Sequence, residues 1–155
     1  MKLIASTFKG TRREGDWAWE LQKGLRPKAL YIFNDNCTDH SSAKRGGGNA
    51  VIRPWNAFGR EFPPRSAGIS TGDRGKGFGG LDDIQTSSHG RTARAEIDMC
   101  IGEIIELLKT GNYDTVVYSC MSEEDKTLGT GIFTVADDVR RYITQQITAL
   151  VLVED

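Results

Sequence analysis

The chain is poor in cysteine and histidine. Its 155 residues include three cysteines, Cys37, Cys100 and Cys120, and two histidines, His40 and His89. The odd number of cysteines and the lack of a CxxC pair argue against a disulfide framework and against a cysteine-rich zinc site. A histidine-based metal site would need carboxylates from distant loops. We therefore expect neither a bound metal ion nor a cofactor.

An excess of charge of one sign is also missing. The chain has 20 Lys and Arg residues against 21 Asp and Glu residues, which gives a net charge of -1. Broad binding to nucleic acid needs a surplus of cations against the phosphate backbone, so this balance argues against it. A small basic pocket for a single nucleotide remains open.

Long apolar runs are absent as well. The longest ones, such as Ile104-Ile105 and Leu150–Val153, fall far short of the roughly 20 residues that span a bilayer. The apolar patch in residues 1–17 is too short for a signal peptide. We therefore expect a soluble, cytoplasmic protein that does not contact a membrane.

The spacing of apolar residues predicts one α/β domain over residues 1–155, in which helices flank a mainly parallel central sheet. Residues 29–33 are almost wholly apolar and end in Asn34, as is typical of a central strand buried on both faces. The loops that follow parallel strands meet at the carboxyl edge of a sheet, where ligands bind in such folds. The expected strands are 2–8, 29–33, 66–71 and 115–119, and the expected helices are 49–53, 96–109 and 136–150.

Glycine is unevenly distributed, because 11 of the 18 glycines lie in the region 46–90. No repeat period accompanies them, so a solenoid is not indicated. This region is either a mobile surface loop or the rim of a binding site, since long loops in small domains are usually functional or disordered.

The first candidate site follows the expected central strand. Short polar side chains at residues 34–39 could hydrogen-bond a sugar or a base, and the triple glycine Gly46-Gly47-Gly48 before Asn49 would leave backbone N–H groups free for a phosphate. Lys44, Arg45 and Arg53 would add local positive charge. An Asx-rich turn followed by a flexible linker explains the same residues without a ligand.

The second candidate site is the segment Gly129-Thr130-Gly131-Ile132-Phe133, between a strand and the last helix. It is neither a Walker loop nor a dinucleotide fingerprint. A loop that only enters the helix is the alternative.

Two aromatic residues and one threonine also lie near these loops. Phe78 either stacks on a base or anchors its loop in the core, Trp55 is either a pocket wall or a core residue, and Thr71 is a further candidate contact.

The order of these motifs resembles a divergent macro domain. The resemblance rests on the Asn-rich turn, the triple glycine entering a helix, and the late strand leading to Gly-Thr-Gly-Ile-Phe. It implies a macro-like fold that binds ADP-ribose, with contacts from Asn34 or Asn36, from 46–48 and from 129–133. The family's adenine-binding Asp near the first strand has no clear counterpart, and Asp16 is the nearest candidate.

Over roughly residues 29–145 the chain also resembles small phage and bacterial proteins with a Phe-x-Asp-Asn, His and glycine-rich pattern. That resemblance includes His40. It would fit a phage anti-defence protein that sequesters a signalling nucleotide of the host's immune system.

Three functions follow as hypotheses. The first is a binder of a small nucleotide-derived ligand, of the ADP-ribose or cyclic-nucleotide type. The second is a hydrolase of the same ligand, in which Asp35, Asp39 or His40 activates water. The third is a phage structural or protein-interaction module whose glycine-rich loop orders on binding a partner. Whether the protein forms a homo-oligomer is left open.

Overall fold

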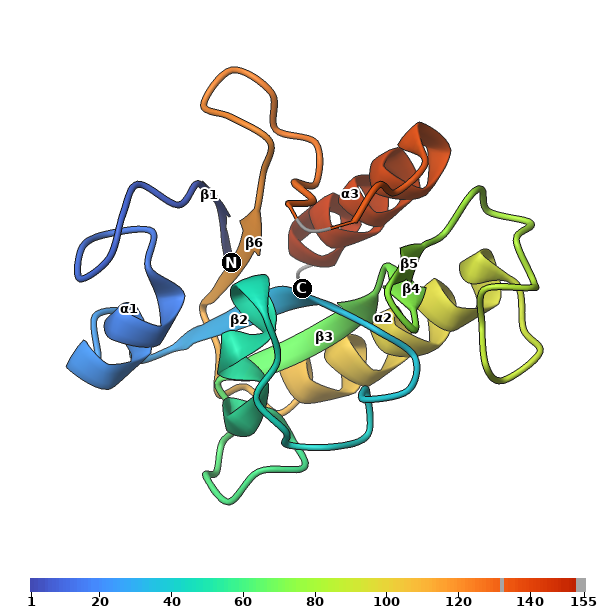
Figure 1. The fold of residues 1–155 in the computed structure, drawn as a ribbon. Helices are drawn as coiled ribbons and strands as arrows, with labels where there is room; N and C mark the ends of the chain where they lie inside the picture. Colours follow the sequence, from blue (N-terminus) through green and yellow to red (C-terminus); the bar gives the residue numbers. More distant parts are fainter. Residues whose placement is uncertain (132, 153–155) are drawn as a thin grey trace.

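The computed structural model describes residues 1–131 and 133–152. It is an α/β fold with a four-stranded parallel sheet of order β1-β6-β2-β3, as the sequence predicted (Figure 1). In chain order the elements are β1 (Lys2–Ser6), α1 (Trp17–Lys23), β2 (Ala29–Asp35), the 3-10 helix η1 (Gly48–Trp55), β3 (Ser66–Ser70), β4 (Gly72–Asp73), β5 (Lys76–Gly77), α2 (Ala93–Leu108), β6 (Thr115–Ser119) and α3 (Asp137–Leu152).

The central strand β2 is buried on both faces of the sheet. Leu30 and Ile32 pack with α2 and α3, whereas Ala29, Tyr31 and Phe33 pack with α1 and η1. Side chains alternate between faces along a strand, so a run without polar residues requires cover on both sides. This explains why the apolar run at 29–33 identified the centre of the sheet.

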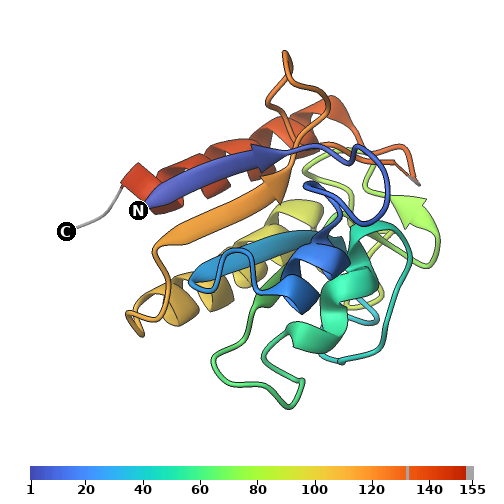
Figure 2. The ribbon, with the colours of Figure 1, turned by 90° about the vertical axis from the view of Figure 1, so that its left-hand side faces the viewer.

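The helices form two layers around this sheet. Helices α2 and α3 cover one face, and α1 and η1 cover the other (Figure 2). All four strands run in the same direction. Their carboxyl ends therefore lie at one edge, where the loops after β1, β2, β3 and β6 gather.

The sequence missed α1 and the small hairpin of β4 and β5. Helix α1 has only seven residues, too few for a clear period, although its ends carry the expected signals. Asp16 caps its start by accepting a hydrogen bond from the Trp19 N–H, and Gly24 ends it in a left-handed conformation. Asp16 is thus used by the helix cap.

Among the described residues, no helix combines the length and the apolar character that crossing a bilayer requires.

Candidate functional site

Asn34 joins two loops at the carboxyl edge of the sheet, which we call the first glycine loop (46–49) and the second glycine loop (129–133). Its backbone N–H donates to Asn49 Oδ1 at 2.8 Å, and its side-chain Nδ2 donates to the Gly129 carbonyl oxygen at 2.7 Å. The two segments expected to bind ligand are therefore tied to one residue of the central strand. The Asn34 amide is committed to this role, so it acts as a clamp between the loops.

The first glycine loop leaves donors free. Within the described residues, the backbone N–H groups of Gly47, Gly48 and Asn49 donate no hydrogen bond. Gly48 has a φ of 57°, in the left-handed region that favours glycine. Free N–H groups at the start of a helix attract anions.

The cations near this loop divide into two kinds. Lys44 and Arg45 are exposed, and neither side chain forms an ion pair within the described part of the chain. Arg53 is only 2% exposed, and its Nη1 donates to the Lys44 carbonyl oxygen at 2.9 Å. A Cβ on Gly46 would lie 2.7 Å from that Nη1, so Gly46 gives the guanidinium room. Arg53 is thus a buried structural cation, and Lys44 and Arg45 remain available to a ligand.

The second glycine loop begins with a close backbone contact. The Gly129 N–H donates to the Ser119 carbonyl oxygen at 2.9 Å, and a Cβ on Gly129 would lie 2.7 Å from the Cys120 carbonyl oxygen. Glycine at this position lets the loop pass directly over the end of β6.

The rest of this loop is open. Thr130 is half-buried and Gly131 is exposed, and a Cβ on Gly131 would meet no atom within 4 Å. Phe133 has an exposed fraction of 47%. Ile132, also expected to contact ligand, lies outside the described residues.

Asp35 points into the protein, toward β3. Its Oδ1 accepts hydrogen bonds from Arg53 Nε and Nη2, at 3.1 and 2.6 Å, and from the Asn36 N–H at 2.8 Å. Its Oδ2 lies 2.8 Å from His40 Nδ1. A Cβ on Gly68 would lie 2.1 Å from Oδ2, so only glycine at this position of β3 admits the carboxylate. Both oxygens are occupied, which removes Asp35 from contact with a ligand.

His40 lies between two carboxylates. Its Nε2 is 2.5 Å from Glu103 Oε1 on α2, and its Nδ1 bonds Asp35. Burial lowers the pKa of His40, but hydrogen bonds to the two carboxylates and to the Cys100 thiol outweigh it and raise the pKa to about 12. The ring is therefore an imidazolium at neutral pH, with no lone pair to accept a proton. This geometry does not support His40 as a general base.

Cys100 is buried in the core beside this ring. Its Sγ lies 3.9 Å from Nδ1 and 3.8 Å from Nε2 of His40. His40, Cys100 and Glu103 are close enough to be considered as metal ligands. Both ring nitrogens already bind carboxylates, however, which makes this cluster a poor metal site.

The remaining polar candidates stabilise the turn after β2. Asn36 and Asp39 bond each other twice, since the Asp39 N–H donates to Asn36 Oδ1 at 2.8 Å and Asn36 Nδ2 donates to Asp39 Oδ2 at 3.1 Å. Thr71 donates to the Asp35 carbonyl oxygen through its N–H at 3.0 Å and through its hydroxyl at 3.2 Å. These residues thus shape the edge of the sheet and leave few groups for a ligand.

The two aromatic residues left open by the sequence are placed by their burial. Phe78 is fully buried in the core formed with α2 and α3, so it anchors its loop and does not stack on a base. Trp55 is partly buried and packs against the core under α1 and η1.

A cleft of about 310 Å³ lies at the carboxyl end of β1, beside the loop that follows β6. It is lined in part by Ser6, Gly15 and Lys126. The Ser6 carbonyl oxygen accepts from the Cys120 N–H at 2.9 Å. Cys120 directly follows Ser119, whose carbonyl oxygen accepts from the Gly129 N–H. A second, open cleft of about 430 Å³ lies between the 79–85 loop and Asp138. The glycine loops line neither cleft.

The sequence did not anticipate the buried Asp35–Arg53–His40 cluster with Glu103. Glu103 lies on α2, and its partner His40 is 63 residues away in the sequence. The one available signal was an Asp at the end of an otherwise apolar strand, because a buried carboxylate requires a cation.

Comparison with models of protein families, with curated proteins and with solved structures finds no match to this chain. The resemblance to macro domains therefore remains a prediction from motifs.

Proposed function

We propose that the protein binds a small nucleotide-derived ligand, of the ADP-ribose or cyclic-nucleotide type, at the carboxyl edge of its sheet. The observation that carries the proposal is the pair of hydrogen bonds from Asn34, which holds the two glycine loops against one strand end. Two glycine loops that approach each other form a natural clamp for a diphosphate or phosphodiester.

Each part of this edge has a role in the proposal. The free N–H groups of Gly47, Gly48 and Asn49 donate to the phosphate oxygens, and exposed Arg45 adds positive charge. Exposed Phe133 provides an apolar face for a base or sugar. The cleft of about 310 Å³ at the carboxyl end of β1 has the size of a small-ligand pocket.

Binding without turnover is favoured over hydrolysis. A general base must have a free lone pair within reach of the attacking water. Asp35 uses both carboxylate oxygens internally, and His40 is protonated. Asp39 accepts from Asn36 Nδ2 through Oδ2 alone, so it is the candidate base that this geometry disfavours least. A binder of this kind would sequester its ligand, which is the use expected from the resemblance to phage proteins.

The test is calorimetry and thermal-shift measurement with ADP-ribose, NAD, cyclic dinucleotides and cyclic ADP-ribose isomers, followed by chromatography of the recovered ligand. We expect one of these to bind, to raise the melting temperature and to be recovered intact. A converted ligand would favour the hydrolase, and no binding by any of them would contradict the proposal.

The variant Gly131→Val tests the place of binding. A Cβ at this position meets nothing within 4 Å, so the fold should tolerate Val while the isopropyl group blocks the clamp. The control is Gly102→Val on α2, which is equally open. We expect Gly131→Val to weaken binding at least about tenfold, or about 1.4 kcal/mol, and Gly102→Val to leave it unchanged. Equal affinity of both variants would remove the second glycine loop from the site.

A further inference from the structure

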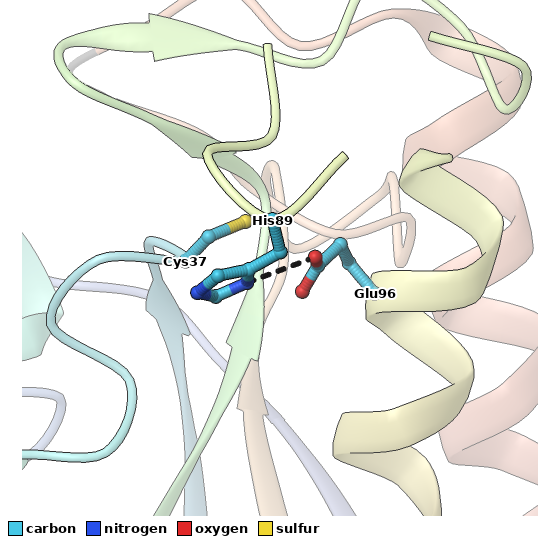
Figure 3. A group of neighbouring side chains, drawn as sticks. All are labelled: Cys37, His89 and Glu96. Atoms are coloured by element: carbon cyan, nitrogen blue, oxygen red, sulfur yellow. Dashed lines mark hydrogen bonds and ion pairs between the residues drawn. The ribbon is translucent and has the colours of Figure 1, made fainter. Parts of the chain in front are cut away.

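Three potential metal ligands that are distant in the sequence converge beside β2. Cys37 follows the strand, His89 lies in the loop before α2, and Glu96 lies in the first turn of α2. Their ligand atoms all lie within 4.8 Å of one another, and Figure 3 shows the three side chains turned toward a common point. His89 Nδ1 is 3.1 Å from Glu96 Oε1. In tetrahedral zinc sites neighbouring ligand atoms are separated by about 3.3–3.8 Å, so small side-chain movements would complete the geometry.

We propose that Cys37, His89 and Glu96 form a binding site for one transition-metal ion of the zinc class. A thiolate, an imidazole nitrogen and a carboxylate oxygen are the donors that Zn²⁺ takes, whereas Mg²⁺ and Ca²⁺ prefer oxygen ligands. With a thiolate, a carboxylate and a neutral imidazole, the charge of a divalent ion is balanced. Three protein ligands leave a fourth position for water or another ligand.

The surrounding contacts hold the ligands in place. The Cys37 N–H donates to the Gly72 carbonyl oxygen at 3.1 Å, which fixes the backbone after β2. Ser87 Oγ donates to Glu96 Oε1 at 2.8 Å and accepts from the His89 N–H at 3.1 Å. Partners outside the first coordination sphere orient the ligands of metal sites in the same way.

A second contact of this kind anchors the loop that carries His89. The Ser88 N–H donates to Asp73 Oδ2 at 3.0 Å, which ties this loop to the hairpin of β4 and β5. The loop is therefore fixed at its base as well as at Glu96.

The burial of two of the three side chains and the access of the third to solvent are suited to binding an ion. Cys37 and Glu96 are 3% and 4% exposed, whereas the His89 side chain is 41% exposed and opens the cluster to solvent. Burial and the nearby charge of Glu96 raise the pKa of the Cys37 thiol to about 12, so without a cation the thiol keeps its proton. Binding of the metal forms the sulfur–metal bond and releases this proton to solvent.

One competing cation is present. Arg91 Nε lies 3.1 Å from the same Glu96 Oε1 that accepts from Ser87. Arg91 Nη2 also lies 3.1 Å from His89 Nδ1, so the arginine, which is 41% exposed, has to turn to solvent for that nitrogen to bind the ion. The proposal does not depend on the nucleotide site, because these residues contact neither glycine loop.

Titration of the whole chain with Co²⁺ and Zn²⁺, without nucleotide, tests the site. We expect one equivalent of metal per chain and a thiolate-to-cobalt charge-transfer band. Cys37→Ser should abolish the band, and His89→Gln should weaken affinity by about 10–100-fold. Cys100→Ser and Cys120→Ser are controls of the same chemistry in other buried thiols, and both should keep the band.

Three results would overturn the proposal. They are binding well below one equivalent in the wild type, a band that survives Cys37→Ser, and a band that is lost only in Cys100→Ser. If Cys37→Ser does not fold, His89→Gln decides alone, because its exposed side chain can be replaced without disturbing the core. Unchanged affinity in that variant would then refute the site.

Discussion

The His40 ring and the Asp35 carboxylate form an inward-facing pair, with Nδ1 2.8 Å from Oδ2 and the carboxylate fully buried. Arg53 binds the other oxygen of the same carboxylate at 2.6 Å. Two cations therefore converge on one acid beneath the turn after β2. Asp35 and His40, which the sequence offered as candidate catalytic residues, therefore stabilise the fold. The glycine loops remain as the candidate ligand contacts at this edge of the sheet.

The protonated state of His40 predicts a pH dependence of stability. The pKa of His40 is about 12 in the folded protein, against 6.5 for an ordinary histidine. The stabilisation is complete below pH 6.5, falls as the pH rises further, and is lost once the pH exceeds the folded pKa. Between pH 7 and 7.5, about one unit or more below the ordinary thiol pKa of about 8.5, the wild type should lose unfolding free energy with a slope that approaches about 1.4 kcal/mol per pH unit.

Urea unfolding at several pH values measures this slope. His40→Gln should remove it, and His89→Gln, which replaces the other histidine, should retain it. A wild-type slope equal to that of His40→Gln would show that the ring is neutral in the folded protein and would restore it as a candidate base.

Two arginines eight residues apart should behave in opposite ways. Arg53 is buried against Asp35, so Arg53→Met leaves a buried carboxylate with one cation fewer and should lower the unfolding free energy by about 3–5 kcal/mol. Arg45 is exposed, so Arg45→Met should leave stability within about 0.5 kcal/mol and weaken nucleotide binding. Denaturant unfolding and calorimetry on both variants check this. A stable Arg53→Met protein would refute the buried pair.

The sequence predicted the layered fold because its signals were local. The apolar run at 29–33 requires cover on both faces, and the pattern of residues 96–109 is helical over several turns. The direction of a polar side chain depends instead on distant partners. Asp35 turns inward because Gly68 on β3 makes room, and no pattern around Asp35 carries that information.

The same limit applies to the two side-chain clusters. His40 meets Glu103 across 63 residues, and Cys37 meets His89 and Glu96, which lie 52 and 59 residues later in the chain. Counting cysteines and histidines by spacing along the chain argued against a metal site, whereas the fold brings three potential ligands within 4.8 Å of one another.

Asn34 and Asn36 offered the same chemistry in the sequence, and the structure separates them. Asn34→Ala removes the Nδ2 bond to Gly129, and Asn36→Ala removes the bonds to Asp39. Each variant should lose about 1 kcal/mol of stability, the usual net value of a hydrogen bond. Only Asn34→Ala should weaken nucleotide binding, by about tenfold, because only that change frees the glycine loops from each other. Equal affinities in calorimetry would show that the clamp does not form the site.

Phe78 and Phe133 make the last matched pair, because one is fully buried and the other is 47% exposed. Phe78→Ala would leave a cavity beneath the loop that follows β5 and should cost about 3–5 kcal/mol of stability. Phe133→Ala removes an exposed ring and should change stability by less than about 0.5 kcal/mol. If the exposed ring stacks on the base of the ligand, its loss should weaken binding by about 1 kcal/mol or more, roughly fivefold. Phe133→Tyr keeps the aromatic face and should bind like the wild type. Full affinity in Phe133→Ala would remove this ring from the site and direct the search for the base toward the cleft at the carboxyl end of β1.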